Sequence, residues 1–247
     1  MSLAVHTPDS VPGVLEALRD GALVIAGGTH VMPRVNTEAT DVTALVSLRQ
    51  AELAGIEVAD GVARIGAATT LSQLRRSPEL AFLHEALDAI ASPTIRNMAT
   101  VGGNLFVPQP YGDLAVCLLA LDAQVHLAGG ATATVEELES GLVTAVSFEL
   151  PKEWRFTKAM RRRLNSASIV TVAAVLDEGR TRIALGGVAP RPVRARHAEE
   201  ALAHGVEAAA QAALEDADPF DDAYASAWYR RRVLPVHVRR ALLGEEA

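Results

Sequence analysis

The chain has 247 residues and a mass of 26.1 kDa, which is enough for one large domain or two modest ones. Apolar residues make up 49 % of the chain and charged residues 21 %, so this composition excludes a globally disordered protein. The formal net charge of −7 argues against a general nucleic-acid or anionic-membrane surface.

The single cysteine limits the metal chemistry. Cys117 alone cannot form an internal disulfide, build a thiolate zinc site or hold an iron–sulfur cluster. No His/Asp/Glu cluster has metal-ligand spacing, so no metal site is predicted. No apolar run approaches the roughly 18 residues of a membrane span, and the first residues lack the pattern of a signal peptide. We therefore expect a soluble, cytoplasmic protein.

The N-terminal residues predict a helix followed by a strand. Ser10 precedes a helical pattern over Val11–Arg19 that ends before Gly21. The short apolar run Ala22–Ala26 then reads as a buried strand that leads into a glycine loop. A second strand is predicted at Thr43–Leu48.

The next elements carry clear turn and capping signals. Ile56–Val58 and Ala63–Ile65 flank Asp60-Gly61, which predicts a β-hairpin. Thr70 and Gln73 have the spacing of a helix capping box. A longer helix follows Ser77-Pro78, and four apolar side chains share one of its faces: Leu80, Leu83, Leu87 and Ile90.

A second glycine loop is predicted at Thr100–Asn104. Asp113 then stands before an apolar helix over Leu114–Leu121, where it could be simply the N-cap. Strands are predicted at Ala123–Leu127 and Leu142–Leu150.

The composition changes after Pro151, where arginine becomes common, and we place a domain boundary there. Three strands are predicted beyond it, and helices follow from Ala198. The strands are Arg155–Met160, Ile169–Leu176 and Arg182–Val188. The last helix spans Trp228 to Leu243 and contains Pro235, which should kink it.

Two of the four Gly-Gly pairs point to a ligand. A glycine pair is usually a turn, but Gly27-Gly28 and Gly102-Gly103 are each flanked by threonine and by small or polar residues. Glycines let consecutive backbone N–H groups approach a diphosphate closely. Neither pair has the spacing of a Rossmann fingerprint or a P-loop.

Four blocks of sequence carry a resemblance to a known family: Ala26–His30, Ile65–Thr70, Ser92–Asn104 and Tyr111–Leu114. In this order they are similar to the FAD-binding medium subunit of molybdenum hydroxylases, the xanthine dehydrogenase, carbon monoxide dehydrogenase and aldehyde oxidoreductase type. Ala184–Arg194 and Tyr229–Leu242 resemble the C-terminal domain of that family. The resemblance covers essentially the whole chain, and its most specific part is Ile95–Asn104.

The resemblance implies an α+β fold in two domains. Residues 1–151 would form a two-lobed FAD-binding domain of the PCMH (vanillyl-alcohol-oxidase-like) type, with lobes at about 1–54 and 55–151. Residues 152–247 would form a smaller C-terminal α+β domain, a three-stranded sheet with helices.

The resemblance also implies the residues that bind the cofactor FAD. A first pyrophosphate loop would contain Ala26, Gly27, Gly28, Thr29, His30 and Val31, and a second would contain Thr100, Gly102, Gly103 and Asn104. Asp113 would bond hydroxyls of the ribose or ribityl chain, and Val146 would pack near the isoalloxazine. Lys158 would lie at its pyrimidine edge, although a lysine in a strand is more often solvated.

The resemblance implies an electron-transfer subunit that passes electrons from [2Fe–2S] clusters on a small partner chain, through FAD, to a terminal acceptor. A large partner chain would carry the molybdenum cofactor. The C-terminal domain, with its arginine-bearing strand and long final helix, is a candidate for part of the docking surface. Two alternatives remain open: a stand-alone FAD-dependent oxidase or dehydrogenase, and a scaffold subunit that has lost flavin. No residue is assigned a catalytic role.

Two departures from the family pattern concern the surroundings of the flavin ring. The stretch between Ala131 and Val143 is shorter than in relatives. Arg155-Phe156-Thr157 stands before Lys158, where relatives often carry a tyrosine.

Overall fold

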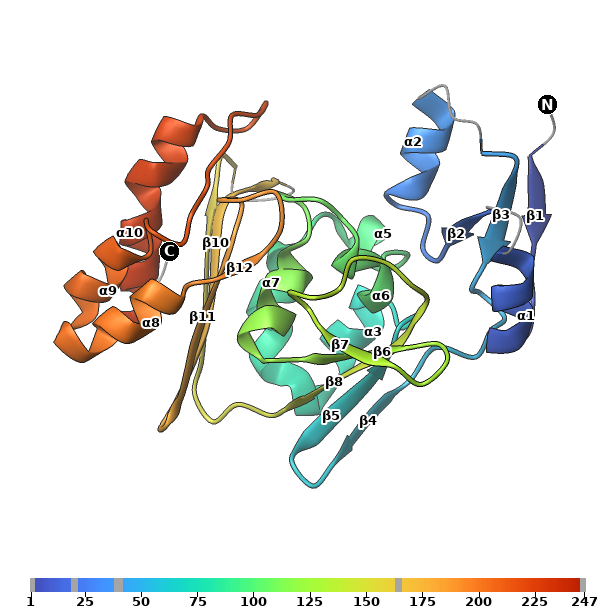
Figure 1. Ribbon diagram of the computed structural model, residues 1–247, viewed down its shortest axis with the longest axis horizontal. Helices are drawn as coiled ribbons and strands as arrows, with labels where there is room; N and C mark the ends of the chain where they lie inside the picture. Colours follow the sequence, from blue (N-terminus) through green and yellow to red (C-terminus); the bar gives the residue numbers. More distant parts are fainter. Residues whose placement is uncertain (1–2, 19–21, 38–41, 163–165, 245–247) are drawn as a thin grey trace.

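The computed structural model describes residues 3–18, 22–37, 42–162 and 166–244, so Arg19 and Gly21, at the end of the first predicted helix, lie outside the described residues. The chain forms three parts that follow one another in space as they do in sequence (Figure 1). Each part has its own β-sheet, and the second part lies in the middle.

The N-terminal lobe contains a three-stranded parallel sheet in the order β1-β3-β2. Its elements are β1 (Ala4–His6), α1 (Val11–Ala17), β2 (Leu23–Ile25), α2 (Val31–Thr37) and β3 (Ala44–Ser47). The predicted helix and both predicted strands are confirmed, whereas β1 and α2 were not predicted. Val14, Val46 and Leu48 form the centre of a small core.

The middle lobe contains a five-stranded antiparallel sheet in the order β4-β5-β8-β6-β7. Its strands are β4 (Ile56–Ala59), β5 (Val62–Gly66), β6 (Gln124–Leu127), β7 (Thr132–Thr134) and β8 (Val143–Glu149). The predicted hairpin is confirmed, because Asp60 and Gly61 both have positive φ angles, of 51° and 77°.

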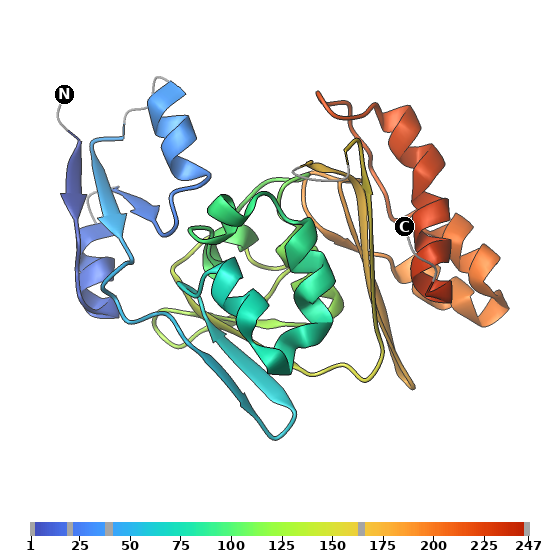
Figure 2. The ribbon, with the colours of Figure 1, turned by 180° about the vertical axis from the view of Figure 1, so that it is seen from behind.

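Helices cover one face of this sheet (Figure 2). They are α3 (Leu71–Arg76), the 3₁₀ helix η2 (Pro78–Leu83), α4 (His84–Ala89), α5 (Pro93–Arg96), α6 (Val101–Leu105) and α7 (Asp113–Ala120). The Thr70–Gln73 capping box is present, and the four apolar side chains predicted for the longer helix are all buried. The pattern missed that this helix is divided between η2 and α4.

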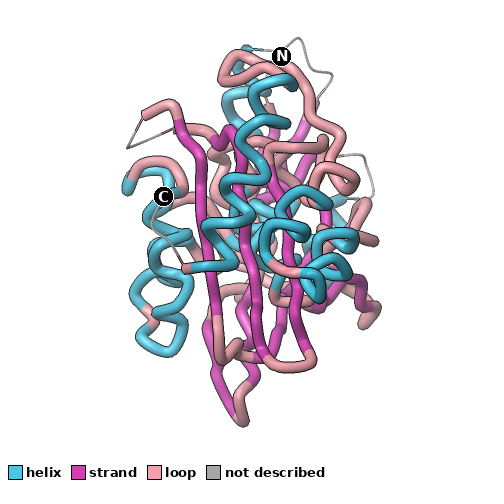
Figure 3. The backbone as a smooth tube through the Cα atoms, turned by 90° about the vertical axis from the view of Figure 1, so that its left-hand side faces the viewer, coloured by secondary structure: helices cyan, strands magenta, loops and turns pink. Residues whose placement is uncertain are grey.

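The C-terminal part contains an antiparallel sheet in the order β12-β11-β10-β9, with helices on its outer face (Figure 3). The elements are β9 (Trp154–Met160), β10 (Ser168–Asp177), β11 (Arg180–Gly186), β12 (Val193–Arg194), α8 (Arg196–Ala201), the 3₁₀ helix η3 (Leu202–His204), α9 (Val206–Ala212) and α10 (Ala227–Leu243). The three predicted strands are present. The two-residue strand β12 pairs with β11 and makes the sheet four-stranded, where three strands were expected.

The C-terminal sheet is buried on both faces. Val172 and Ala174 of β10 pack toward the outer helices, whereas Ala173 and Val175 join the core of the middle lobe. The helix on that inner side is α7, and all eight of its residues are buried. Apart from Asp113, α7 is apolar around its whole circumference, as expected for a helix covered on all sides. It contacts β10 and β11 and shares one core with residues of the middle sheet.

Candidate functional site

The first glycine segment follows β2 and leads into α2. Gly28 has a φ of +70°, a left-handed conformation that favours glycine. A Cβ atom on Gly27 would lie 1.8 Å from the backbone oxygen of Met98, so only glycine allows this contact. The first predicted pyrophosphate loop therefore contacts the backbone of Met98 and Ala99, the two residues directly before the second.

The second glycine segment is a short helix, and the prediction of a loop is wrong there. Thr100 is the N-cap of α6, and its Oγ1 accepts a hydrogen bond of 3.2 Å from the Gly103 N–H. The N–H groups of Val101 and Gly102 donate to the carbonyls of Thr69 and Ala67 at 2.9 and 2.8 Å. These first-turn N–H groups are engaged within the protein, so the segment is not an open anion nest.

The two glycines of α6 have different neighbours. A Cβ on Gly102 would lie 2.8 Å from the Cβ of Ala67, so this glycine permits close packing against residues 66–70. A Cβ on Gly103 would meet only the Thr100 Oγ1, at 3.0 Å. Gly103 is thus the glycine of this pair that is open on its outer side.

Residues 66–70 connect α6 with the end of the N-terminal lobe. The Thr69 hydroxyl accepts a bond of 2.9 Å from the Gly55 N–H and donates one of 3.0 Å to the Gly55 carbonyl. The Ala68 N–H donates to the Leu53 carbonyl at 2.9 Å. Residues 67–69 therefore hold residues 53–55 on one side and α6 on the other.

Arg96 explains part of the 95–104 block in structural terms. Its guanidinium donates to the carbonyls of Ile90 and Ala91 at 2.7 and 2.8 Å, just beyond the end of α4. This contact fixes α5 against α4. Ile95 and Met98 then remain at the surface beside the first glycine segment.

Large apolar side chains are exposed along this stretch. Ile95, Met98, Phe106 and Tyr111 are 38–48 % exposed. Such side chains normally become buried when a ligand or partner covers them. They belong to the stretch of sequence that carries the second glycine segment, so apolar surface is available there for a ligand or a partner.

Asn104 serves the internal structure. It is buried, and its Oδ1 accepts a hydrogen bond of 3.1 Å from the Ala115 N–H of α7. His30 lies directly before α2, at the end of the first glycine segment.

Asp113 and Lys158 form a buried ion pair between α7 and β9. Lys158 Nζ lies 2.8 Å from Asp113 Oδ2 and donates a second bond of 2.8 Å to the Ala89 carbonyl. The hydroxyls of Ser168 and Thr171 donate to Asp113 Oδ1 at 2.5 and 2.6 Å. Both charged side chains are 2 % exposed.

This pair corrects the alternatives drawn from sequence. Asp113 is not an N-cap, because Gly112 occupies that position and the carboxylate bonds to other elements. Lys158 is not a solvated strand residue. Contact of either side chain with a cofactor would require it to exchange a protein partner.

Val146 lies inside the core. It belongs to the central strand β8, is paired with Ile65 and Val125, and has no exposed surface. Packing of this side chain on a flavin ring would require the covering residues to move.

Gln109 is a residue that sequence reasoning missed. It lies in the segment between α6 and α7, where its Oε1 accepts a bond of 2.8 Å from the Gly187 N–H and its Nε2 donates to the Gly112 carbonyl at 3.3 Å. The C-terminal domain thus holds the segment that joins two predicted cofactor regions. Its partner Gly187 belongs to another Gly-Gly pair, Gly186-Gly187, which the sequence alone does not connect with Gln109.

Tyr111 makes a second link of this kind at the surface. Its hydroxyl lies 2.8 Å from that of Tyr224, and the rings meet edge to face with centroids 5.8 Å apart. The bond to Tyr224, together with partial burial, raises the pKa of Tyr111 to about 12.

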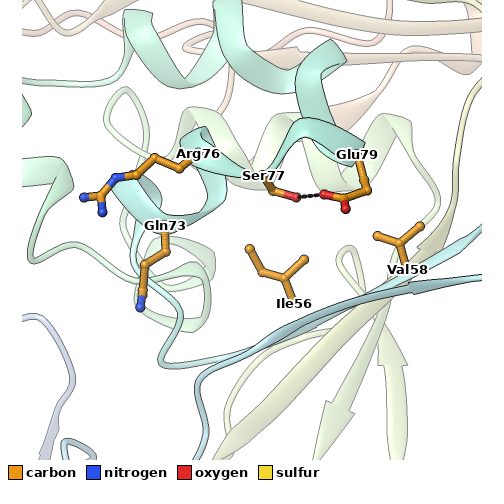
Figure 4. Close-up of a pocket in the computed structure, with 6 residues that line it drawn as sticks. All are labelled: Ile56, Val58, Gln73, Arg76, Ser77 and Glu79. Carbon is orange, nitrogen blue, oxygen red and sulfur yellow. Dashed lines mark hydrogen bonds between the residues drawn. The ribbon is translucent and has the colours of Figure 1, made fainter.

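A recess of about 350 Å³ lies between β4 and the α3–η2 turn, and none of the predicted site residues lines it (Figure 4). Its lining residues are Ile56, Val58, Gln73, Arg76, Ser77 and Glu79. The Ser77 hydroxyl donates to Glu79 at 2.8 Å.

Within the described ranges, no group of three or more His, Cys, Asp or Glu side chains could hold a metal ion. Nor does any helix of that part of the chain combine the length and apolarity needed to cross a bilayer. Burial raises the pKa of the Cys117 thiol. A reactive thiolate is therefore unfavourable at this position.

Comparison with known proteins gives a consistent result. Residues 1–151 match the family model described as the FAD binding domain in molybdopterin dehydrogenase, and residues 155–244 match the CO dehydrogenase flavoprotein C-terminal domain. The 6-hydroxypseudooxynicotine dehydrogenase complex subunit alpha of Paenarthrobacter nicotinovorans is 34 % identical, over 95 % of this chain and 91 % of its own length. The uncharacterized protein YgfM of Escherichia coli K12 is 32 % identical, over 94 % and 92 %.

A solved structure agrees with the sequence relatives. It is carbon monoxide dehydrogenase from Hydrogenophaga pseudoflava, in a form that lacks the Mo-pyranopterin moiety of the molybdenum cofactor. The match has a TM-score of 0.91 and 27 % identity, and covers 98 % of this chain and 96 % of that chain.

Proposed function

The chain belongs to the family of FAD-binding medium subunits of molybdenum hydroxylases, and on this premise we propose that it relays electrons from [2Fe–2S] clusters on a partner chain, through FAD, to a terminal acceptor. Membership makes the chain an oxidoreductase subunit whose cofactor is FAD. The direction of electron flow, the partner chains and the residues that touch FAD are our proposals.

The observation that carries the proposal is the contact of the first glycine segment with the residues directly before the second. Gly27 reaches the backbone of Met98 from a different lobe, and only a residue without a side chain fits there. Exposed apolar side chains at 95–111 belong to the same stretch. The residues present therefore fit a ligand that combines a diphosphate with apolar rings.

We assign the diphosphate chiefly to residues 26–31. Among the described residues, the N–H groups of Gly27, Gly28 and Thr29 donate to no protein acceptor, whereas those of Val101, Gly102 and Gly103 do. Free N–H groups in a glycine segment can bind phosphate oxygens. Residues 100–104 would form the opposite wall, with Gly103 as the point of close approach.

The buried polar groups would support the site by fixing the elements that form its walls. Asp113 and Lys158 fix α7 and β9 against each other, and Asn104 fixes α6 against α7. When bound, FAD supplies the ability to exchange electrons singly with iron–sulfur centres and in pairs with a final acceptor. The protein's task is to hold it between fixed walls.

The proposed partners are a large chain with the molybdenum cofactor and a small chain with two [2Fe–2S] clusters. The one cysteine of this chain is buried and cannot ligate a cluster, so clusters must be on another chain. Two relatives are named as a complex subunit and as a medium chain.

We also propose the domain division 1–151 and 152–247, with lobes at about 1–54 and 55–151. The first sheet ends at Ser47 and the second begins at Ile56, and β8 ends at Glu149 just before Pro151. The division separates the sheets and follows the sequence. It does not separate the hydrophobic cores, because α7 and the C-terminal sheet share one core.

The test compares the isolated chain with the complete complex. We expect pure protein to show the visible absorbance of bound flavin. With an artificial acceptor, the FAD-loaded chain should not oxidise aldehydes or N-heterocycles, whereas the complex should. Turnover by the chain alone at the rate of the complex would favour a stand-alone oxidase, and a protein that cannot bind flavin would favour a scaffold.

The site assignment has its own test. Gly103→Val should lower FAD affinity at least tenfold, about 1.4 kcal/mol or more, because a bulky side chain would occupy the open side of α6. Thermal unfolding should show that the variant is folded. Unchanged flavin content in such a folded variant would reject this assignment.

A further inference from the structure

Exposed large apolar side chains gather on two segments of the described chain. One is the stretch 95–111, which the FAD site accounts for. The other is α10, where Trp228 is 67 %, Tyr229 42 %, Val236 45 % and Leu243 48 % exposed. The proposed function does not account for this second group.

The exposed side chains of α10 include a continuous stripe. Its members follow one another at intervals of four, four, three and four residues: Trp228, Arg232, Val236, Arg239 and Leu243. At 100° per residue these positions fall within about 80° of the helix circumference, and the stripe is about 22 Å long. The Arg232 guanidinium lies over the Trp228 ring, 5.8 Å from its centroid.

The opposite face of α10 packs against the core of the C-terminal domain. Leu234, Val238 and Ala241 pack in the core formed with β10 and β11. Arg230 is fully buried. It donates to the Gly187 carbonyl at 2.7 Å and pairs with Asp222 at 2.7 Å. The fold therefore fixes which face of the helix points outward.

The charge of α10 differs from that of the whole chain. The helix carries five arginines and no acidic residue, in a chain of net charge −7. Arg232 is exposed within the stripe, Arg231 is exposed beside it, and Arg239 pairs with Glu207 on α9. The outer face thus combines large apolar side chains with arginines.

We propose that the outer face of α10 is the docking surface for another subunit of the dehydrogenase complex, a protein surface with an apolar socket for Trp228 and an acidic rim for Arg231 and Arg232. This inference rests on the proposed function. Exposed tryptophan and arginine are the residue types that most often dominate binding energy at interfaces. Charge complementarity selects the occupant, because a second copy in a symmetric contact would bring two basic helices together.

The stripe would supply the centre of the interface. A stable interface buries about 800 Å² on each partner, more than one helix face provides. Acidic and apolar groups of the partner would meet Trp228 and Arg232 first, and neighbouring segments would complete the contact. Because exposed charges contribute, association should weaken as ionic strength rises.

The experiment uses the full-length tagged chain, produced in its native host and purified with whatever subunits it holds. Iron, molybdenum and FAD are measured per chain for the wild type, for Arg232→Glu, and for Trp228→Ser combined with Arg232→Glu. Val5→Ser is the control, since Val5 is 60 % exposed on β1, far from α10 in sequence. Thermal unfolding confirms that each variant is folded.

We expect iron and molybdenum to fall at least tenfold in the double variant and by a smaller factor in Arg232→Glu. FAD per chain should stay at the wild-type level, and Val5→Ser should retain both metals. Full metal content in the folded double variant would overturn the docking surface while leaving the proposed function intact. A wild-type chain that carries FAD but neither metal would contradict the proposed function and the docking surface together. A homodimer that the double variant abolishes would overturn the proposal by making a second copy the occupant.

Discussion

The two junctions between the three parts of the molecule are built in different ways. The N-terminal lobe meets the middle lobe mainly through backbone and small residues: Gly27 on Met98, and residues 53–55 on 66–69. Leu142 is the large side chain of the middle lobe that joins the N-terminal core. The middle lobe meets the C-terminal domain through a buried ion pair, a shared core and Gln109. Further ion pairs, such as Arg196 with Glu136, cross the second junction near the surface.

The difference indicates which junction a bound ligand can stabilise. In the second junction, α7 and the C-terminal sheet bury apolar surface together, so these parts should unfold as one unit. In the first junction, the helices and strands of the N-terminal lobe pack mainly on one another. The proposed FAD site spans this first junction, so bound FAD should add contacts where the protein has few of its own.

The largest expected effect breaks the second junction. Lys158→Met leaves the Asp113 carboxylate buried without its cation, which should cost about 3–5 kcal/mol. For a chain of this length, that corresponds to a Tm decrease of about 10 °C. Thermal unfolding by circular dichroism measures it.

Two variants make this result specific. Lys152→Met removes the charge of an exposed lysine and should leave Tm nearly unchanged. Combining Lys158→Met with Asp113→Leu removes both charges and should recover part of the loss. Equal Tm values for Lys158→Met and the wild type would mean that the ion pair does not hold the junction.

The second effect breaks the first junction. Gly27→Ala places a methyl group 1.8 Å from the Met98 oxygen, so the lobes must separate. FAD affinity should fall at least tenfold, about 1.4 kcal/mol or more, while the rest of the molecule keeps its stability. Flavin titration followed by absorbance gives the affinity.

The control lies in the same lobe. Gly13→Ala adds the same methyl group in α1, where the nearest atom would be 3.1 Å away. It should bind FAD as the wild type does. Equal FAD affinity in Gly27→Ala would separate the cofactor site from this junction.

Local elements could be predicted from sequence because their signals are local. The Asp60-Gly61 turn and the Thr70–Gln73 capping box each depend on residues within one turn, and both were found. Gly102 and Gly103 were read as a loop since glycine disfavours helix. Contacts from residues 67–69 stabilise α6 there, and no local pattern shows them.

In the candidate site too, local motifs could be predicted, whereas contacts between distant residues could not. The resemblance identified the two glycine segments, but their contact through Met98 depends on how the lobes pack. Asp113 and Lys158 were both singled out, 45 residues apart, and no spacing rule shows that they bond each other. Gln109 was missed because a single glutamine in a loop has no pattern.

The third prediction tests whether protonation of His237, in the C-terminal domain, lowers stability at acid pH. Burial, with a smaller contribution from Arg240, lowers the pKa of His237 from 6.5 to about 4. The unfolded chain therefore binds a proton at this site between about pH 6.5 and 4 that the folded chain does not. Stability from this group is complete above pH 6.5 and decreases as the pH falls.

We expect a loss of about 2 kcal/mol between pH 7 and pH 5, a Tm change of about 4–8 °C. His237→Leu should show a flatter Tm profile over that range, and the difference between the two profiles isolates this histidine. Parallel profiles would mean that another group is responsible.

The smallest effect sharpens the comparison of the junctions. Tyr224→Phe removes the 2.8 Å bond to Tyr111, which also crosses the second junction but lies at its exposed margin. Water can replace the lost partner there, so we expect a cost of about 0.5 kcal/mol. That is several times less than the cost of Lys158→Met, which removes two buried bonds between the same two parts, to Asp113 and to the Ala89 carbonyl. Tyr111 should also titrate at lower pH in Tyr224→Phe, because the bond that holds its pKa at about 12 is gone; an ultraviolet titration measures this. If Tyr224→Phe lowers Tm as much as Lys158→Met does, burial is not what strengthens the second junction, and the distinction drawn between buried and exposed links fails.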